Sequence, residues 1–290
     1  MKVTVVTPSF NQAAFIERTV ESVLAQRGDF ELEYLVVDGG STDGTAARME
    51  PYRDRLTFLS EPDRGQSDAI NKGFARARGD VLAWLNSDDT YLPGALERVC
   101  AALRRPGARW CFGQCRVIDE ADRPIRGFIR GYKNWLARRY SRRLLLTKDF
   151  IPQPATFFRR ELLEQAGPLD PSLHYAMDYD LWLRFADLAD PVFVPEDLAC
   201  FRWHDSSKSG ARYHVSALEA LAAARRRARP DDRGVILRHR LHVLSLVAGY
   251  RLLDALRPRS LAAPGSAGTA TPAPPGPGRP AAPPRGSRPR

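Results

Sequence analysis

The chain has 290 residues, a hydrophobic share of 43% and a formal net charge of +10. This length and composition are ordinary for a globular protein and accommodate one large domain or two small ones. Six arginines and no acid lie from Arg257 onward, so residues 1–256 carry only +4. Most of the basicity therefore belongs to the C-terminal tail, and nucleic acid is not the expected partner.

The four cysteines (100, 111, 115 and 200) show no C-x-x-C spacing, so neither a zinc site nor a redox motif is indicated. Free thiols in a reducing compartment are expected. A strand predicted to begin at Val3 leaves no room for a secretory signal, and no apolar run approaches the ~20 residues needed to span a bilayer. We therefore expect a cytoplasmic protein.

Strands and helices alternate through the first hundred residues. Short apolar runs at 3–6, 35–37, 56–59 and 81–85 are typical of buried strands. Apolar residues at helical spacing follow the first run, at Ile16, Val20, Val23 and Leu24. The alternation predicts an α/β fold with a central, mostly parallel sheet flanked by helices.

The run Val81–Leu85 ends abruptly in Asn86, Ser87, Asp88 and Asp89. Carboxylates at the C-terminal end of a buried strand lie where open α/β sheets bind their ligands. Two adjacent acids and an amide suit Mg²⁺ or Mn²⁺ holding a diphosphate. The alternative is that Asp88 and Asp89 only cap the helix predicted to begin near Pro93.

Thr7 and Asp38 follow the first two predicted strands, so both should lie at the same sheet edge as Asp88. Asp38 suits hydrogen bonds to a base N–H or a ribose hydroxyl. The alternative role for Asp38 is to cap the helix predicted after Gly44. Six residues separate the two, which is too far for an N-cap. No G-x-G-x-x-G or G-x-x-x-x-G-K-[ST] occurs, so a dinucleotide dehydrogenase and a P-loop enzyme are unsupported.

The regular alternation fades after Pro106. A strand is predicted at Trp110–Gln114, and residues 123–148 carry nine Lys or Arg and no acid, interleaved with aromatic residues. That mixture suits a surface meeting anionic lipid or a phosphate-bearing acceptor. An ordinary solvated basic helix is the alternative.

A carboxylate apart from the metal cluster is needed if an acceptor hydroxyl is to be deprotonated. Asp178 is the candidate base, near the start of a helix predicted over Met177–Ala189, whose positive end should keep it ionised. Asp180 is two residues on and points elsewhere around the helix. His204, after the predicted strand Leu198–Arg202, is either a metal ligand or a core histidine.

Two further helices are predicted over 216–229 and 234–257, and the second could lie on a membrane surface or pack against the main domain. Ten of the 23 prolines fall from Pro258 onward with almost no apolar bulk. We therefore expect a main domain over 1–210, with halves 1–105 and 106–210, a helical extension over 211–257 and a disordered tail over 258–290.

Several segments together resemble the inverting glycosyltransferases of family two, which have the GT-A fold. The resemblance covers about residues 1–210. Its segments are Val5-Val-Thr-Pro-Ser-Phe-Asn11, Val36-Val-Asp-Gly-Gly-Ser-Thr-Asp-Gly-Thr45, Gly65-Gln-Ser-Asp-Ala-Ile-Asn-Lys-Gly73, Leu85-Asn-Ser-Asp-Asp89, Met177-Asp-Tyr-Asp-Leu-Trp-Leu-Arg184 and Phe201-Arg-Trp-His-Asp-Ser-Ser-Lys-Ser209.

The resemblance implies a role for each matching position. Thr7 and Asp38 would hold the donor nucleoside, with Gln66, Ser67 and Asp68 bordering the donor pocket, and Asn86 would bind as a neutral group, for example to ribose. Asp88 and Asp89 would hold the metal, with His204 near the diphosphate and within reach of it, and Asp178 would be the general base. Asn86 stands where the family often has Asp, and Met177 replaces an acid common before the catalytic Asp. The Gln-x-x-Arg-Trp of processive members is absent.

The expected activity is metal-dependent transfer of a single hexosyl-type sugar, with inversion, from a nucleotide-sugar donor to an acceptor hydroxyl. UDP is the favoured nucleotide, ahead of dTDP and GDP. A saccharide or lipid-linked saccharide of a cell-surface polysaccharide is the expected acceptor. Two other classes stay open: a sugar-phosphate nucleotidyltransferase, and a non-catalytic module that binds a nucleotide-sugar or an anionic surface.

Overall fold

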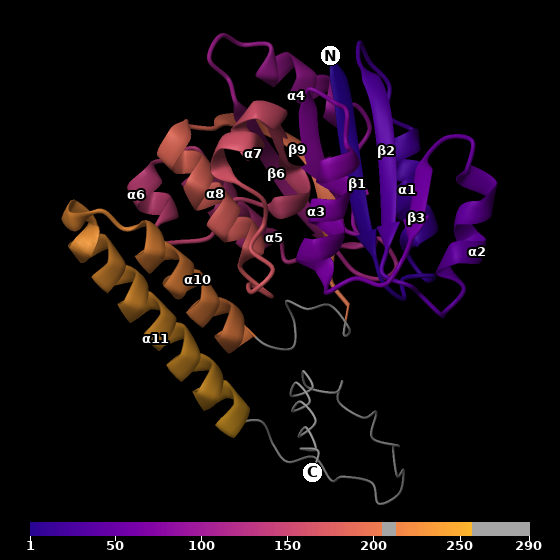
Figure 1. Ribbon diagram of the computed structural model, residues 1–290. Coiled ribbons are helices and arrows are strands. Elements are labelled where there is room, and N and C mark those ends of the chain that lie inside the picture. Colours follow the sequence, from indigo (N-terminus) through magenta and orange to yellow (C-terminus); the bar gives the residue numbers. More distant parts are fainter. Residues whose placement is uncertain (205–212, 257–290) are drawn as a thin grey trace, which may run out of the picture. The chain divides into compact units, whose positions relative to one another are not determined.

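The computed structural model describes residues 1–204 and 213–256 (Figure 1). The predicted disordered tail, 258–290, lies outside these residues. The helices and strands in chain order are β1 (Lys2–Ser9), α1 (Ile16–Leu24), β2 (Glu31–Asp38), α2 (Thr45–Met49), η1 (Glu50–Tyr52), β3 (Thr57–Ser60), α3 (Gln66–Arg76), β4 (Val81–Trp84), β5 (Thr90–Tyr91), α4 (Ala95–Leu103), β6 (Trp110–Ile118), β7 (Pro124–Ile125), α5 (Gly127–Ala137), α6 (Arg142–Leu145), η2 (Gln153–Ala155), β8 (Thr156–Arg159), α7 (Arg160–Ala166), α8 (Met177–Leu188), β9 (Val192–Arg202), α10 (Tyr213–Arg227), η3 (Pro230–Asp232) and α11 (Arg233–Leu256).

A single sheet runs through the molecule in the order β3-β2-β1-β4-β8-β6-β9-β5, with β7 paired to β6. The four strands β3, β2, β1 and β4 are parallel, as the alternation of strands and helices predicts. Beyond β4 the sheet is mixed, because β8 runs antiparallel to both β4 and β6 while β6 and β9 are parallel. The α/β fold expected from the sequence is therefore present, with its parallel character confined largely to the first half.

Two strands are longer than the apolar runs indicate. β1 continues through Thr7 to Ser9, where the loop was expected, because its edge pairs with β2 as far as Asp38. The two short strands expected at 192–194 and 198–202 are one strand, β9, which pairs along β6 with irregular register around Gly113 and Gln114. Pro195, Glu196 and Asp197 interrupt the apolar pattern, so the sequence suggested two strands instead of one. The strand continues through them because an irregular pairing does not need apolar side chains at every second position.

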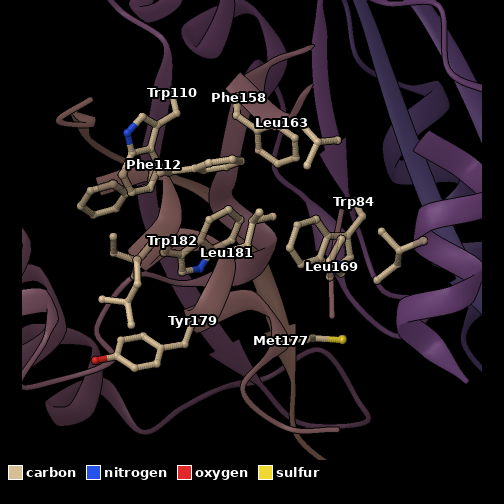
Figure 2. Packing of buried hydrophobic residues seen from close by; sticks show 14 of the residues in the cluster. Trp84, Trp110, Phe112, Phe158, Leu163, Leu169, Met177, Tyr179, Leu181 and Trp182 are labelled. Atoms are coloured by element: carbon tan, nitrogen blue, oxygen red, sulfur yellow. The ribbon is translucent and has the colours of Figure 1, made fainter. Parts of the chain in front are cut away.

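The core lies on both faces of the sheet, in two clusters of buried side chains. One cluster is built on an aromatic stack: Trp182 of α8 lies against Trp84 of β4 and Trp110 of β6, with ring centroids 5.4 and 6.0 Å apart (Figure 2). All three rings are almost fully buried. Because these rings come from three separate elements, their packing fixes α8 against the sheet and thereby sets the position of its first turn.

Helices α10 and α11 complete the body. Ala223 and Ala224 of α10 are buried in the same cluster as α8, and the ring Nδ1 of His239 in α11 lies 2.8 Å from the carbonyl oxygen of Leu146. Residues 1–250 form one compact unit. The domain boundary near residue 210 that the sequence suggests stays a prediction. Of the helices within the described residues, none has both the length and the apolar composition needed to span a bilayer.

Candidate active site

A pocket of about 830 Å³ lies where β1, β2 and β4 end. One wall comes from the loops after these strands and from α3. The other comes from α5, the segment before η2, and the start of α8. The polar lining includes Ser9, Asp63, Gln66, Asn86, Asp88, Arg126, Lys133, Asn134, Asp149, Gln153, His174, Asp178, His204 and Ser216.

The residues after β4 are held by a chain of amide hydrogen bonds. Gln66 Nε2 donates to Asn86 Oδ1 at 2.7 Å, and Asn86 Nδ2 donates to Gln153 Oε1 at 3.1 Å. Gln153 in turn donates from Nε2 to the carbonyl oxygen of Trp84 at 2.7 Å. Gln66 and Asn86, both expected at the donor, are thus brought together, and Gln153, which no sequence motif indicated, ties them to the strand.

Asp88 and His204 meet across 116 residues of sequence, with Asp88 Oδ2 2.9 Å from His204 Nε2. The two side chains are 17% and 2% exposed and both line the pocket. The ring of His204 packs on Phe15, with centroids 4.9 Å apart. The carboxylate of Asp88 is the ligand type that suits Mn²⁺ or Mg²⁺, and the imidazole of His204 is held beside it.

No group of three or more His, Cys, Asp or Glu suited to a metal occurs within the part of the chain that the structure describes. A divalent ion here would therefore complete its coordination with ligand oxygens and water. That arrangement is usual for magnesium-type sites on phosphate groups.

Asp89 is oriented away from the ligand side. Its Oδ1 accepts the backbone N–H of Arg202 at 2.9 Å and its Oδ2 accepts Asn86 Nδ2 at 3.2 Å. The residue is fully buried, and burial together with neighbouring Asp88 raises the pKa of Asp89. Asp89 was expected to hold the metal with Asp88, but here it fastens the loop after β4 to β9.

The helix-capping alternative for Asp88 and Asp89 does not describe this loop. Helix α4 begins at Ala95 after Gly94, which has a left-handed conformation with φ of 75°, and no side chain caps it. The two acids act at β9 and at the pocket instead.

Asp38 and Thr7 lie beneath the pocket rather than in it. Asp38 Oδ2 accepts hydrogen bonds from the backbone N–H of Ser41 at 2.9 Å and from Ser60 Oγ at 2.8 Å. Thr7 Oγ1 is 2.9 Å from the hydroxyl of Tyr34. Both residues are fully buried. In this structure β1 extends past Thr7 and the loop after Asp38 folds back on its carboxylate, so neither residue lines the pocket. The nucleoside contact expected of them stays a prediction.

Asp68 likewise has protein partners. It accepts the backbone N–H of Arg64 at 3.1 Å and pairs with the Arg64 guanidinium at 3.1 Å and with Lys72 at 3.6 Å. The backbone hydrogen bond and the Arg64 side chain hold the pKa of Asp68 below its usual range. Asp68 does not line the pocket, and in this structure it stabilises the start of α3. Its expected contact with the donor stays a prediction.

Two other residues face the pocket at this end. Ser9, the last residue of β1, is 4% exposed, and its Oγ has no hydrogen-bond partner among the described residues. Asp63, in the loop before α3, accepts the backbone N–H of Gly65 at 2.7 Å. A Cβ at Gly39 would lie 2.6 Å from Asp63 Oδ2, so glycine is needed for this approach. Ser9 lies in a segment that matches the family resemblance, whereas Asp63 lies just before one, and neither was singled out.

At the opposite wall, Asp178 shares the pocket with Asp149 and Lys133. Burial, reinforced by the charge of Asp149, raises the pKa of Asp178 to about 7, while Lys133 acts in the opposite direction. Burial also raises the pKa of Asp149, against the effect of Lys133. Much of the surface of Asp149 faces the pocket itself, so the side chain is accessible to the solvent there although protein surrounds it.

The helix position of Asp178 does not keep it ionised in the way the sequence suggested. Burial and the neighbouring acid Asp149 raise the pKa of this carboxyl instead of lowering it. Asp180 has a different partner: its Oδ2 accepts Arg184 Nε at 2.9 Å, and the pair is nearly buried away from the pocket. The geometry therefore distinguishes the two acids, with Asp178 at the pocket and Asp180 in the core.

The loop leading into α8 is held by one carboxylate. Glu219 Oε2 of α10 accepts the backbone N–H groups of His174, Tyr175 and Ala176 at 3.1, 2.7 and 3.1 Å. This contact connects the helical extension to the segment just before Asp178. Nothing in the sequence around Glu219 indicates it, because the pairing depends on how α10 packs against α8.

Comparison with known proteins gives consistent results. The family model described as Glycosyl transferase family 2 matches residues 4–167. An uncharacterized glycosyltransferase of Mycobacterium tuberculosis is 34% identical over 197 residues, which cover 66% of this chain and 71% of the relative. An uncharacterized glycosyltransferase of Nostoc is 30% identical over 234 residues, covering 76% and 69%.

Two solved structures have a similar fold. The mannosyltransferase PcManGT from Pyrobaculum calidifontis, in complex with GDP-Man and Mn²⁺, aligns with a TM-score of 0.62 and 20% identity over 88% of this chain and 81% of its own. Residues 1–349 of S. aureus TarS, in complex with UDP-GlcNAc, align with a TM-score of 0.58 and 17% identity over 77% of this chain and 66% of their own.

Proposed function

Because the chain belongs to glycosyl transferase family 2 and has a GT-A-like fold, we propose that it transfers one hexosyl-type sugar from a nucleotide-sugar donor to an acceptor hydroxyl, with inversion and without processive elongation. The observation that carries the proposal is the shared pocket. It brings Asp88 and His204 on one side together with Asp178 and Asp149 on the other.

The donor occupies the end of the pocket formed by β1, β2 and α3. Ser9 and Asp63 face this end, and their hydroxyl and carboxylate suit hydrogen bonds to a nucleoside. Gln66 and Asn86 border it as a linked pair. Thr7, Asp38 and Asp68 support the loops behind these residues. UDP remains the favoured nucleotide. An acid acceptor such as Asp63 matches the single ring N–H that uracil and thymine share, so this contact does not separate UDP from dTDP.

Mn²⁺ or Mg²⁺ would be held by Asp88 and His204, while Asp89 fixes the loop that carries Asp88. The ion, when bound, neutralises charge on the donor diphosphate. Arg202 supports both sides of this site: its backbone N–H donates to Asp89 and its Nε donates to the carbonyl oxygen of Asp88 at 2.8 Å. The protein thus supplies a preorganised carboxylate and imidazole.

Asp178 is the proposed general base. A carboxylate with a pKa of about 7 accepts a proton far more readily than one with an ordinary carboxyl pKa, while still being substantially ionised near neutrality. It would remove the proton of the acceptor hydroxyl as that oxygen attacks the anomeric carbon from the side opposite the diphosphate. That geometry inverts the configuration. Lys133 and Asp149 set the charge around the base.

The acceptor is proposed to be a saccharide or lipid-linked saccharide of a cell-surface polysaccharide, used in the cytoplasm with the protein in peripheral contact with the inner face of the membrane. The wall of the pocket formed by α5, with Arg126, Lys133 and Asn134, supports an acceptor that carries hydroxyl and phosphate groups. The four cysteines are free thiols, as expected for a reducing compartment.

Calorimetry with UDP, dTDP and GDP, each with and without Mn²⁺, tests the donor and metal assignments. Binding of one nucleotide that depends on Mn²⁺ and is lost in Asp88→Ala is the expected result. Glu161→Ala, a change at an exposed acid of α7 outside the pocket, is the matched control and should bind normally. Equal binding with and without Mn²⁺ would remove the metal from the proposal.

A further inference from the structure

Helix α5 presents two different faces. One face lines the pocket through Arg130, Lys133, Asn134 and Ala137. The other carries Phe128, Tyr132 and Trp135, whose side chains are 91%, 41% and 50% exposed. Positions i, i+4 and i+7 lie along one stripe of a helix, so the three rings form a continuous aromatic surface. We call these three residues the α5 aromatic face.

Cations border this face. The Arg139 guanidinium lies 4.4 Å from the centre of the Trp135 ring, and Lys148 Nζ lies 5.1 Å from the centre of the Tyr132 ring. The two rings themselves stack with centroids 6.3 Å apart. Large aromatic side chains held flat beside arginine and lysine are the combination that lies at the boundary of water and an anionic lipid surface.

Other arginines of this region form ion pairs with carboxylates. Arg130 pairs with Asp197 at 2.8 Å, and Arg142 pairs with Asp187 and Asp232 at 2.7 and 2.8 Å. Arg139 and Lys148 have no carboxylate partner among the described residues. Several arginines of residues 123–148 are thus neutralised by distant acids, whereas the two cations beside the aromatic rings are not so paired within residues 1–204 and 213–256. The missing counter-charge beside the α5 aromatic face points to an anionic partner.

We propose that the α5 aromatic face docks on an anionic lipid bilayer, with Phe128, Tyr132 and Trp135 in the interfacial region and Arg139 and Lys148 on lipid headgroups. A helix with its side chains is only about 10–12 Å across. The pocket face of the same helix is therefore held next to the membrane surface. Docking on the bilayer does not depend on the proposed sugar transfer. The idea that docking brings a lipid-linked acceptor to the pocket rests on the proposed transferase function.

Vesicle flotation of the full chain is the first test. The wild-type protein should float with phosphatidylcholine vesicles that contain phosphatidylglycerol and stay unbound with phosphatidylcholine alone. The double change Phe128→Ser and Trp135→Ser should weaken binding by roughly tenfold or more, because two interfacial aromatic anchors are lost. Leu237→Ser with Leu241→Ser removes two exposed apolar side chains from α11 and is the matched control, expected to bind like the wild type.

Fluorescence locates the contact. Trp84, Trp110 and Trp182 are almost fully buried, and Trp203 is half-buried in the pocket under Arg126, whereas Trp135 is half exposed on the α5 aromatic face. Brominated phosphatidylglycerol should quench part of the tryptophan emission of the wild type, and Trp135→Phe should remove most of that quenching while retaining flotation. All four side chains changed in these variants are exposed, so circular dichroism should show unaltered folding.

Three outcomes would overturn the proposal. In the first, the wild type fails to bind anionic vesicles. In the second, the α5 double variant binds them as well as the wild type does, which would assign binding to the arginine-rich residues 257–290 or to α11. In the third, neither protein binds vesicles and the α5 double variant differs from the wild type in oligomeric state by gel filtration, which would make this face a contact between two copies. Each is distinguishable from failure of the transferase function, because nucleotide binding is measured separately.

Discussion

Acidic side chains have different surroundings at the two walls of the pocket, one formed by the loops after the strands and the other by helices. Asp38 and Asp68 lie behind the donor end, and their carboxylates accept hydrogen bonds from nearby backbone and side-chain groups. Asp149 and Asp178 face the pocket from the other wall, where burial raises the pKa of both and Asp149 adds repulsion at Asp178. The carboxylates of the first pair are engaged by neighbouring protein groups, whereas the raised pKa values of the second pair suit the proton transfer proposed for Asp178.

The largest expected effect comes from removing the base. Asp178→Asn should lower the transfer rate by roughly 10²–10⁴-fold, because an amide cannot accept the acceptor proton. Donor affinity measured by calorimetry should stay within about twofold, since Asp178 lies away from the donor end. Weak donor binding with an ordinary transfer rate would indicate that Asp178 binds the donor and is not the general base.

The corresponding change at Asp180, two residues further along α8, should lower stability instead of the transfer rate. Asp180→Asn removes the partner of Arg184 inside the core, which should cost about 3 kcal/mol of unfolding free energy. The folded fraction should keep its rate per molecule. Urea unfolding monitored by tryptophan fluorescence, beside initial rates normalised to folded protein, separates the two acids. A rate loss as large as that of Asp178→Asn would contradict the division.

Glu219 joins the helical extension to the base. Glu219→Gln keeps the size and one acceptor oxygen but weakens three charge-assisted hydrogen bonds to the loop before α8. We expect a fall of about tenfold in kcat with little change in donor affinity, as a base displaced from its position loses orientation. Glu219→Ala should be worse than Glu219→Gln. Equal loss of stability and activity in both variants would indicate a role in folding only.

The smallest effect is a displacement of the pH profile. Transfer needs ionised Asp178, so the rate should rise with pH through a midpoint near 7. Asp149→Asn removes a neighbouring negative charge and should move the midpoint to lower pH, whereas Lys133→Gln should move it to higher pH. Initial rates between pH 5 and 9 measure this. An identical midpoint in all three proteins would show that another group titrates.

The same raised pKa has a consequence for stability. The folded protein binds the Asp178 proton more tightly than the unfolded chain does. This contribution to stability is fully present below the ordinary carboxyl pKa of about 4 and is lost as pH rises from there through about 7. Asp178→Asn should remove that loss. Thermal unfolding at about pH 5 and pH 8 compares the two proteins directly, and an unchanged difference between the two pH values would contradict the assignment.

Local pattern determined the first half of the fold. Four apolar runs followed by polar residues placed β1 to β4 and their shared edge, because the period of side-chain burial is set by the strand itself. Local pattern also identified the segments that line the pocket, including those of Asn86, Asp88, Asp178 and His204. These residues lie in short, distinctive segments whose spacing is visible without any structure.

Tertiary structure alone decided which polar atoms face the pocket. Asp38, Asp68 and Asp89 have the residue type and sequence position of ligands, yet their oxygens are engaged by Ser60, Arg64 and Arg202. Asp149, Gln153 and Glu219 carry no local signal, because their partners are distant in the sequence. A carboxylate's surroundings depend on which elements pack around it, and that packing is a property of the folded chain rather than of any segment.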